Sequence, residues 1–373
     1  MSRHARQALA AIGLAAAAAA APAEPIFLSR QYSRCTNCHY SPTGGGLLTP
    51  YGRSLSREEL STFGRSPGPK PQGREHEFLF GALGGATGPL SLGIDMRPSR
   101  LRFDLGELTT TRNLLMNADV TAALRHGGFT FYGQVGRQPR GDDPRVASFE
   151  HWVGYESERG LGARVGRFLP AYGVRLADHT TFTRAPLGFD NEDQAYALEL
   201  SYRSERHLVQ LSVGPGLADD VDDAERRAFT ATGRFQLDLT PRAVLVASGL
   251  FKDASALDPS SGATGLALGL APASRLTLWT EADVRFRGGS SGEHAYAIVG
   301  EAAFEVYRGV WLRFTPQLLT AFGDTPAGVV RLSLGVNWLV RSHWNVVFSY
   351  YDDRDRLSDD KTKTLLAQLH LYL

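Results

Sequence analysis

Hydrophobic and polar side chains alternate at every second position along most of the chain. Between residues 276 and 287, Leu278 and Ala282 fall on one face, whereas Glu281 and Asp283 fall on the other. The same separation recurs in residues 296–306 and 330–338. A period of two is the period of a β-strand whose two faces meet different surroundings. The pattern therefore predicts many short amphipathic strands.

Strands of this kind build either a soluble β-sandwich, whose apolar face is buried, or a membrane barrel, whose apolar face meets lipid. The period alone does not say which face is inside. Tight turns are expected at residues 125–128, 157–160, 204–206, 240–242, 273–274, 308–309 and 341–343. Longer polar connections alternate with them, at residues 139–145, 170–193, 214–227, 253–262, 288–293 and 323–327. Outer-membrane barrels have short periplasmic turns and long extracellular loops, so the loop lengths favour the barrel.

The alternation of loops also predicts the number of strands. The last strand, near residues 365–373, has to run toward the periplasm, with Gln368 and His370 facing the lumen and Leu373 facing lipid. Counting back from it, the strand near residues 90–104 is the first of about sixteen. This leaves about 18 residues for each strand and its connection, against roughly 9 to 11 needed to span the bilayer. The expected fold is all-β, a transmembrane antiparallel β-barrel of about sixteen strands in the cell outer membrane.

The chain before the barrel divides into three parts. Residues 1–23 carry two arginines, an alanine-rich apolar run and an Ala-Pro-Ala cleavage site, which together indicate a secretory signal peptide. Residues 24–65 are short, polar and irregular. Residues 66–89 begin as a linker rich in Pro and Gly and continue as a pre-barrel segment near or in the lumen. Residues 90–373 then form the barrel, and the mature chain works outside the cytoplasm.

The N-terminal segment is organised around the motif Cys35-Thr36-Asn37-Cys38-His39. In this spacing two thiols bond covalently to the vinyl groups of a haem, and the adjacent imidazole reaches the iron as proximal axial ligand. Cys35 and Cys38 are the two cysteines of the chain. A periplasmic disulfide and half of a zinc site are the alternatives, but the sequence lacks a thioredoxin-like βαβ context and a second Cys pair. We therefore expect one covalent haem c, bound by Cys35, Cys38 and His39.

The segment around this motif has too few apolar residues for a core of its own, because chains of roughly 40 residues usually need a metal or cofactor to fold. We expect the haem to supply that core. Residues 44–46 are three glycines, which form either a turn that lets the backbone approach the porphyrin or a flexible link. Ser56 and Glu59 have the spacing of a capping box and predict the start of one short helix.

Composition narrows the class of protein further. The chain has 40 glycines, 19 phenylalanines and 13 tyrosines, a composition that suits many short strands. Its formal net charge is +1, which argues against nucleic acid as a partner.

A signal peptide, one haem motif near the mature N-terminus and a porin-like remainder resemble the fused monohaem cytochrome-porins of the outer membrane, best known as iron oxidases of iron-oxidising bacteria. Ser29-Arg30 before the motif is similar to that family's Ala-Arg, and residues 48–53 (Leu-Thr-Pro-Tyr-Gly-Arg) are similar to its Leu-Thr-Pro-Phe-Gly-Arg. The inserted glycines 44–46 and the Ser-Leu-Ser-Arg at residues 54–57 depart from the family, which continues Phe-Lys-Leu-Asn-Gly. These departures concern the electron donor more than the architecture.

The resemblance implies an electron conduit, an oxidoreductase of the iron-oxidase type. One haem would pass electrons between an extracellular metal ion such as Fe²⁺, or another redox partner, and a periplasmic electron carrier, from a place in the periplasm or the barrel lumen. The distal iron ligand is open, with His179 and His76 as the first candidates and Met96 after them. Weaker candidates are His151, His207, His294, His343 and His370. A diffusion porin with an incidental motif and a haem-bearing sensor or assembly protein are the alternatives.

Two groups of charged residues are further candidates. Arginines around the long connection at residues 170–193 either pair with haem propionates or line the lumen as in plain porins; they are Arg164, Arg167, Arg175 and Arg184. Acidic clusters in two presumed outer loops either attract cations or are ordinary solvated surface. These clusters are Asp219, Asp220, Asp222 and Asp223, and Asp352, Asp353, Asp355, Asp359 and Asp360.

Overall fold

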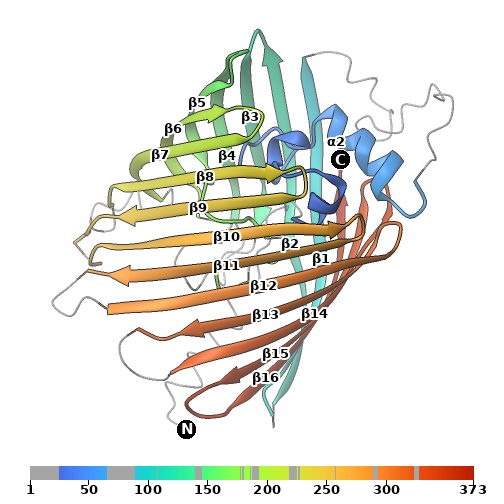
Figure 1. Cartoon of the computed structure of the whole chain (residues 1–373), viewed down its shortest axis with the longest axis vertical. Helices are drawn as coiled ribbons and strands as arrows, with labels where there is room; N and C mark the ends of the chain where they lie inside the picture. The colour runs from blue at the N-terminus through green and yellow to red at the C-terminus, as the bar shows by residue number, and fades with distance from the viewer. Residues whose placement is uncertain are drawn as a thin grey trace.

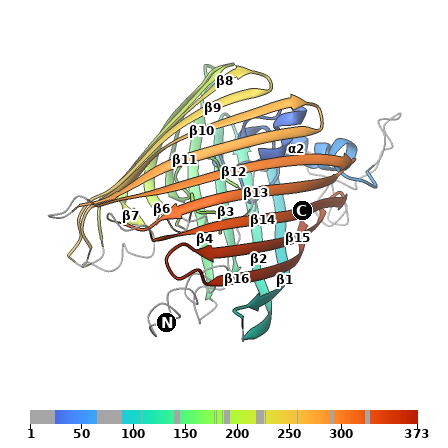
Figure 2. The same cartoon turned by 60° about the horizontal axis from the view of Figure 1, so that its bottom comes forward.

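The computed structural model forms a closed antiparallel barrel in which each strand pairs with its neighbours in the chain and the first strand pairs with the last. It describes residues 25–64, 89–106, 108–138, 145–176, 178, 180–184, 186, 193–217, 225, 227–256, 258–288, 293–322 and 327–373. Figures 1 and 2 show the ring of strands with the N-terminal segment, drawn in blue, near the end where the C-terminus lies.

Sixteen strands make up the barrel within the described residues. Their bounds are β1 Leu90–Asp104, β2 Thr109–His126, β3 Phe129–Gln138, β4 Arg145–Glu156, β5 Leu161–Phe168, β6 Ala195–Arg203, β7 His207–Leu217, β8 Thr230–Thr240, β9 Ala243–Lys252, β10 Ser261–Ala273, β11 Leu276–Arg287, β12 Glu293–Tyr307, β13 Val310–Thr320, β14 Gly328–Arg341, β15 Trp344–Asp355 and β16 Lys361–Tyr372. The first strand has the predicted bounds, and the last begins four residues earlier than predicted.

The apolar face of the strands lies on the outside of the barrel. In β11, Glu281 and Asp283 are 4% and 2% exposed, whereas Leu278 on the other face is 36% exposed. A soluble sandwich would bury the leucine and expose the carboxylates. The inverted arrangement is that of a barrel whose outer surface meets lipid, and it confirms the predicted fold class.

Short turns and longer connections alternate along the barrel as predicted. Adjacent strands joined by short turns meet at one end, and Gly128 and Gly309 adopt left-handed backbone angles there, with φ of 86° and 77°. These angles favour glycine because a Cβ clashes with the backbone in this region. Leu373, predicted to face lipid, is buried, because it follows the last residue of β16 and its N–H donates to the Ile94 carbonyl at 2.9 Å.

The N-terminal segment, residues 25–64, forms three turns of 3₁₀ or π-helix and one α-helix. They are η2 Pro25–Arg30, η3 Cys35–Asn37, α2 Pro50–Leu55 and η4 Ser56–Leu60. The helix begins at Pro50, with the Thr49 hydroxyl accepting from the Gly52 N–H at 3.1 Å, rather than at the predicted capping box. Ser56 instead continues this helix as a π-turn. No helix among the described residues is long and apolar enough to cross a membrane.

The core of the N-terminal segment comes from the barrel wall. Ile26 is fully buried against Ala303 and Trp311, and the Phe27 ring meets the Trp311 ring edge-on at 6.4 Å between centroids. Leu28 belongs to a larger cluster with strand residues. The segment therefore packs inside the barrel. The predicted signal peptide, the linker and most of the pre-barrel segment lie outside the described residues.

Candidate functional site

The haem motif lies on a short hairpin-like turn. Residues Cys35–Asn37 form one turn of 3₁₀-helix, and the His39 N–H donates to the Cys35 carbonyl at 2.9 Å. The chain then reverses, so that His39 pairs with Leu48 as an isolated β-bridge. The reversal contains residues 44–46, whose φ angles of 79°, 77° and 57° favour glycine at each position. The three glycines thus make a turn, which was one of the two predicted roles.

The helix after this turn packs against the motif. The Thr49 N–H donates to the Cys38 carbonyl at 2.8 Å, and the Thr49 hydroxyl donates to the same oxygen at 3.2 Å. A Cβ on Gly52 would lie 2.5 Å from that carbonyl oxygen, so a glycine is required for the helix to approach so closely. The Leu-Thr-Pro-Tyr-Gly-Arg stretch therefore positions Cys38 through its backbone.

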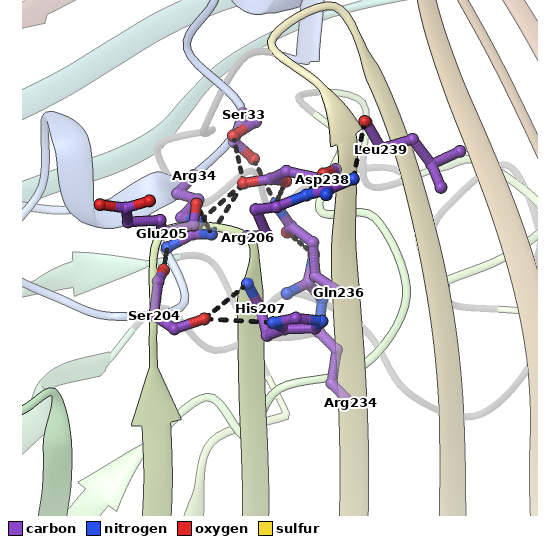
Figure 3. A network of polar contacts seen from close by, with 10 residues as sticks. All are labelled: Ser33, Arg34, Ser204, Glu205, Arg206, His207, Arg234, Gln236, Asp238 and Leu239. Carbon is purple, nitrogen blue, oxygen red and sulfur yellow. Dashed lines mark hydrogen bonds and ion pairs between the residues drawn. The ribbon is translucent and has the colours of Figure 1, made fainter.

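Arg34, the residue before the motif, attaches it to the short-turn end of the barrel (Figure 3). Its guanidinium forms an ion pair with Asp238 on β8 at 2.8 Å and donates to the carbonyls of Ser204 and Glu205 at 2.6 and 2.9 Å. Ser33 donates to the same carboxylate at 3.2 Å. These contacts fix the motif near the β6–β7 turn.

Other contacts join the segment to the seam where β1 meets β16. The Tyr40 hydroxyl lies 2.6 Å from the Ser91 hydroxyl on β1, and the Ser56 hydroxyl lies 2.9 Å from the Tyr372 hydroxyl on β16. Farther along, the Thr62 N–H donates to the Leu339 carbonyl at 2.8 Å. The segment therefore contacts both the first and the last strand of the barrel.

The long connection after β5 folds into the lumen. The Tyr172 hydroxyl donates to Asp283 at 2.7 Å, the Val174 N–H donates to Glu281 at 3.0 Å, and the Phe182 N–H donates to Gln317 at 2.9 Å. Inward-facing strand residues thus hold the loop. It also contacts the N-terminal segment, because the Thr43 hydroxyl donates to the Leu169 carbonyl at 3.0 Å.

A cavity lies between the segment, the loop and the wall. It has about 1110 Å³ of space outside the protein atoms, part of which is open solvent. Cys35, Cys38 and His39 all line it, so the structure brings the three predicted ligands to one place. Its other lining residues include Phe27, Tyr32, Leu48, Leu60, Val174, Trp279, Leu339, Asn345, His370 and Tyr372.

The ionisation of the motif follows from this apolar setting. Burial raises the pKa of the Cys35 thiol, against the opposing effect of Arg234 and Arg175. Burial, with a smaller effect of Cys35, raises the pKa of Cys38 to about 11. Burial, aided by Arg175, lowers the pKa of His39 to about 4. At neutral pH His39 is therefore a neutral imidazole, the form that binds metal, and its buried Nδ1 has no hydrogen-bond partner among the described residues.

The candidate arginines separate into two groups. Arg175 lines the cavity, a position that fits either predicted role, propionate partner or lumen-lining residue. Arg164 instead forms a buried ion pair with Glu199 at 2.9 Å, and Arg184 donates to the Tyr172 carbonyl at 3.2 Å. Neither lines the main cavity, nor does Arg167. Sequence reasoning missed Arg234 and Arg34, which do line it; inward parity in β8 was the available signal for Arg234.

The distal-ligand candidates have different outcomes. His179 and His76 lie outside the described residues. Met96 lies on the outward face of β1, between two buried inward residues, and does not reach the cavity. His370, a weaker candidate, does line the cavity, and its Nε2 lies 3.2 Å from Asp95.

The acidic clusters also differ. The cluster at residues 219–223 lies outside the described residues. In the other cluster, Asp353 forms an ion pair with Arg331 at 2.6 Å, and Asp359 forms one with Arg354. Two of the five carboxylates of this cluster are therefore paired with arginines.

Comparison with known proteins identifies the fold. No family model and no curated protein matches the chain. Among solved structures, a loop-L8 deletion mutant of the Vibrio cholerae outer-membrane protein OmpT matches with a TM-score of 0.58 at 10% identity, covering 76% of this chain and 99% of that one. OprB of Pseudomonas putida matches with 0.58 at 10%, covering 76% and 94%. An anion-selective porin from Comamonas acidovorans matches with 0.57 at 10%, covering 76% and 99%. The fold is thus that of outer-membrane porin barrels.

Proposed function

We propose that this protein is an outer-membrane electron conduit in which one covalent haem c, bound by Cys35, Cys38 and His39, lies inside the barrel lumen. The observation that carries the proposal is that both thiols and the imidazole of the motif face one cavity inside the barrel. A plain porin has no need of such a group of residues in its lumen. A porin-like barrel fold supports the outer-membrane location.

The residues present fit a haem in three respects. The thiols of Cys35 and Cys38 are not joined to each other and are protonated at neutral pH. The Nδ1 of His39 is buried without a partner among the described residues, in a neutral ring suited to iron. Apolar side chains such as Trp279 and Leu48 line the space beside them. When bound, the haem supplies one-electron transfer at its iron.

The chain's own residues hold and screen this site. Arg34 and Thr49 fix the motif from both sides, through Asp238 and the Cys38 carbonyl. Tyr172 and Val174 hold the inward loop over the cavity on the side of the long connections. A hydrocarbon core of about 30 Å insulates the two aqueous compartments, so a closed barrel is required to carry a cofactor at membrane depth.

The partners follow from the ends of the barrel. The motif lies at the short-turn end, which is periplasmic in outer-membrane barrels, so a periplasmic electron carrier would meet it there. An extracellular redox partner, with Fe²⁺ as the candidate from the family resemblance, would approach from the other end. His179 and His76 stay proposed distal ligands, and His370 joins them because it lines the cavity.

A diffusion porin with a structural haem is the second candidate function. It is favoured by the fold likeness to porins, one of which is described as anion-selective. Contact between residues 25–64 and the loop after β5 inside the barrel speaks against an open channel. Conductance in a planar bilayer separates the two functions: a porin gives stable open channels, and a plugged conduit gives little current.

The first test of the proposal is covalent haem. Denatured protein from outer membranes should retain a haem stain, and its mass should exceed the mature polypeptide by one haem group. Cys35→Ala combined with Cys38→Ala should lose the stain while the barrel keeps its heat-modifiable mobility. Wild-type protein that releases all its haem in denaturant would contradict the proposal.

A further inference from the structure

Two guanidinium groups in the cavity wall have no carboxylate partner among the described residues. Arg175 comes from the inward loop and Arg234 from the lumen face of β8. Arg175 donates to the carbonyls of Thr43 and Gly44, the former at 3.1 Å. Arg234 donates to the Gly173 carbonyl at 2.9 Å and to the Gln236 side chain at 2.8 Å. All four partners are neutral.

Neither guanidinium forms an ion pair among the described residues, although Glu281 and Asp238 lie close enough to act on the charge of Arg234. The Nε of Arg175 is buried and makes no hydrogen bond to the described residues. Glu150 is close enough to act on the charge of Arg175, but it forms no ion pair with it among the described residues. An unpaired charge away from water is costly, and a bidentate carboxylate compensates a guanidinium best.

Two other arginines in the lumen each form an ion pair with a carboxylate. Arg34 also lines the cavity but already forms an ion pair with Asp238 at 2.8 Å. Arg164, outside the main cavity, is paired with Glu199. Arg175 and Arg234 thus differ from their neighbours because neither forms an ion pair among the described residues. Both charges also oppose the rise that burial causes in the pKa of the Cys35 thiol.

We propose that Arg175 and Arg234 form a dicarboxylate-binding site, and that the two propionates of the haem bound at Cys35 and Cys38 occupy it. The assignment rests on the proposed function. With the propionates at this site, the vinyl edge of the haem would face the motif and its anionic edge would face the contact between the inward loop and β8. The loop and the wall therefore share in holding the cofactor, which the motif alone does not orient.

The site makes an electrostatic prediction that the barrel fold does not. Each guanidinium paired with a propionate cancels a negative charge near the iron, and negative charge stabilises the oxidised, more positive iron. Arg175→Gln and Arg234→Gln should therefore each lower the haem midpoint potential, and the double variant should lower it further. Arg→Lys at either position keeps the charge but loses the bidentate geometry. It should therefore lower the midpoint potential less than Arg→Gln does.

The experiment is a redox titration of purified haem-loaded barrels, with resonance Raman spectra of the propionate bending modes. Arg164→Gln is the matched control, because it removes one lumen guanidinium that is already paired and lies outside the main cavity. We expect lowered potentials and shifted propionate modes in the Arg175 and Arg234 variants, and neither change in the control.

The outcomes separate the two proposals. Covalent haem in every variant, with unchanged potentials and unchanged propionate modes, overturns the dicarboxylate site and leaves the conduit standing. An equal fall in potential for Arg164→Gln also overturns it, because the effect is then general lumen charge. Wild-type protein without covalent haem overturns both. Free phosphate or citrate that shifts the potential of wild-type protein would mean that the arginines bind solution anions rather than propionates, and this too overturns the assignment.

Discussion

The barrel wall and the N-terminal segment are stabilised in different ways. Every strand of the wall is hydrogen-bonded to two neighbours, and the β1–β16 pair closes the ladder. The segment at residues 25–64 has short helical turns and one β-bridge of its own, and its apolar side chains pack on strand residues such as Trp311. The hydrogen-bond ladder of the wall is therefore complete without the segment, whereas the apolar packing of the segment depends on the wall. Changes in the segment should affect the site and spare the barrel.

The largest effect that tests this contrast is expected from His39→Ala. Loss of the proximal ligand should reduce electron exchange with an extracellular metal to background, because axial ligation sets both the potential and the spin state of the iron. The barrel should still insert, since its ladder closes without the segment. Whole-cell Fe²⁺ oxidation or ferric reduction measures the loss of electron exchange, and heat-modifiable mobility measures whether the barrel has inserted. Normal electron exchange in a verified variant would favour the plain porin.

The orientation of the wall gives an all-or-none prediction. Epitope tags at Leu357, in the β15–β16 connection, should be reached by antibody on intact cells. Tags at Arg159 or Ser342, in short turns at the opposite end, should be reached only after the outer membrane is opened. Reversed labelling would place the haem segment on the extracellular side and contradict the proposed direction of the conduit.

A smaller effect is expected where the N-terminal segment packs its apolar side chains against the barrel wall. Ile26 is fully buried, and Ile26→Ala should weaken the packing of the segment by about 2–5 kcal/mol. Phe63→Ala is the matched control, because that ring is 67% exposed and its loss should change stability by no more than about 0.5 kcal/mol. Protease release of the segment across a urea series measures the difference. Loss of the folded barrel in Ile26→Ala would contradict the separation of the two regions.

The pH dependence of the segment has a defined sign. Without haem, His39 is neutral when packed, with a pKa of about 4 against an ordinary 6.5, so the packed segment binds fewer protons than the released one. The free energy that favours the packed over the released segment should have its full value above pH 6.5. It should fall by about 3 kcal/mol as the pH falls toward 4. Protease sensitivity of the Cys35→Ala/Cys38→Ala protein measures this change. His39→Gln should flatten the profile, and an unchanged profile in that variant would assign the dependence to other groups.

The two regions also differ in how far the sequence predicts them. In the wall, parity places Glu281 and Leu278 on opposite faces, and the loop lengths then assign the polar face to the lumen. In the segment, positions are set by distant partners: nothing next to Ile26 in the sequence indicates Trp311. The same holds for Arg234, whose parity was readable but whose meeting with Arg175 depends on a loop folding inward.

The candidate site likewise has one part that the sequence predicts and one part that it does not. The three proposed haem ligands are adjacent in the sequence, and their spacing alone predicts them, because thioether chemistry fixes that spacing. The cavity around them is assembled from the inward loop, β8 and β16, elements far apart in the chain. Met96 was a plausible ligand by residue type, but parity places it on the outer face. Periodicity therefore predicts faces, whereas it does not predict which inward residues converge.

The contacts of the segment with the seam have a consequence for biogenesis. Tyr40 meets Ser91 on β1 and Ser56 meets Tyr372 on β16, so the cavity has its full lining only once these two strands lie together. They are also the strand pair farthest apart in the sequence, and pairing them costs the most loop-closure entropy, so it belongs to the last steps of folding. A maturing chain that has not closed its barrel would therefore offer the proposed haem an incomplete site. Under the proposed function, closure of the barrel and completion of the haem site coincide.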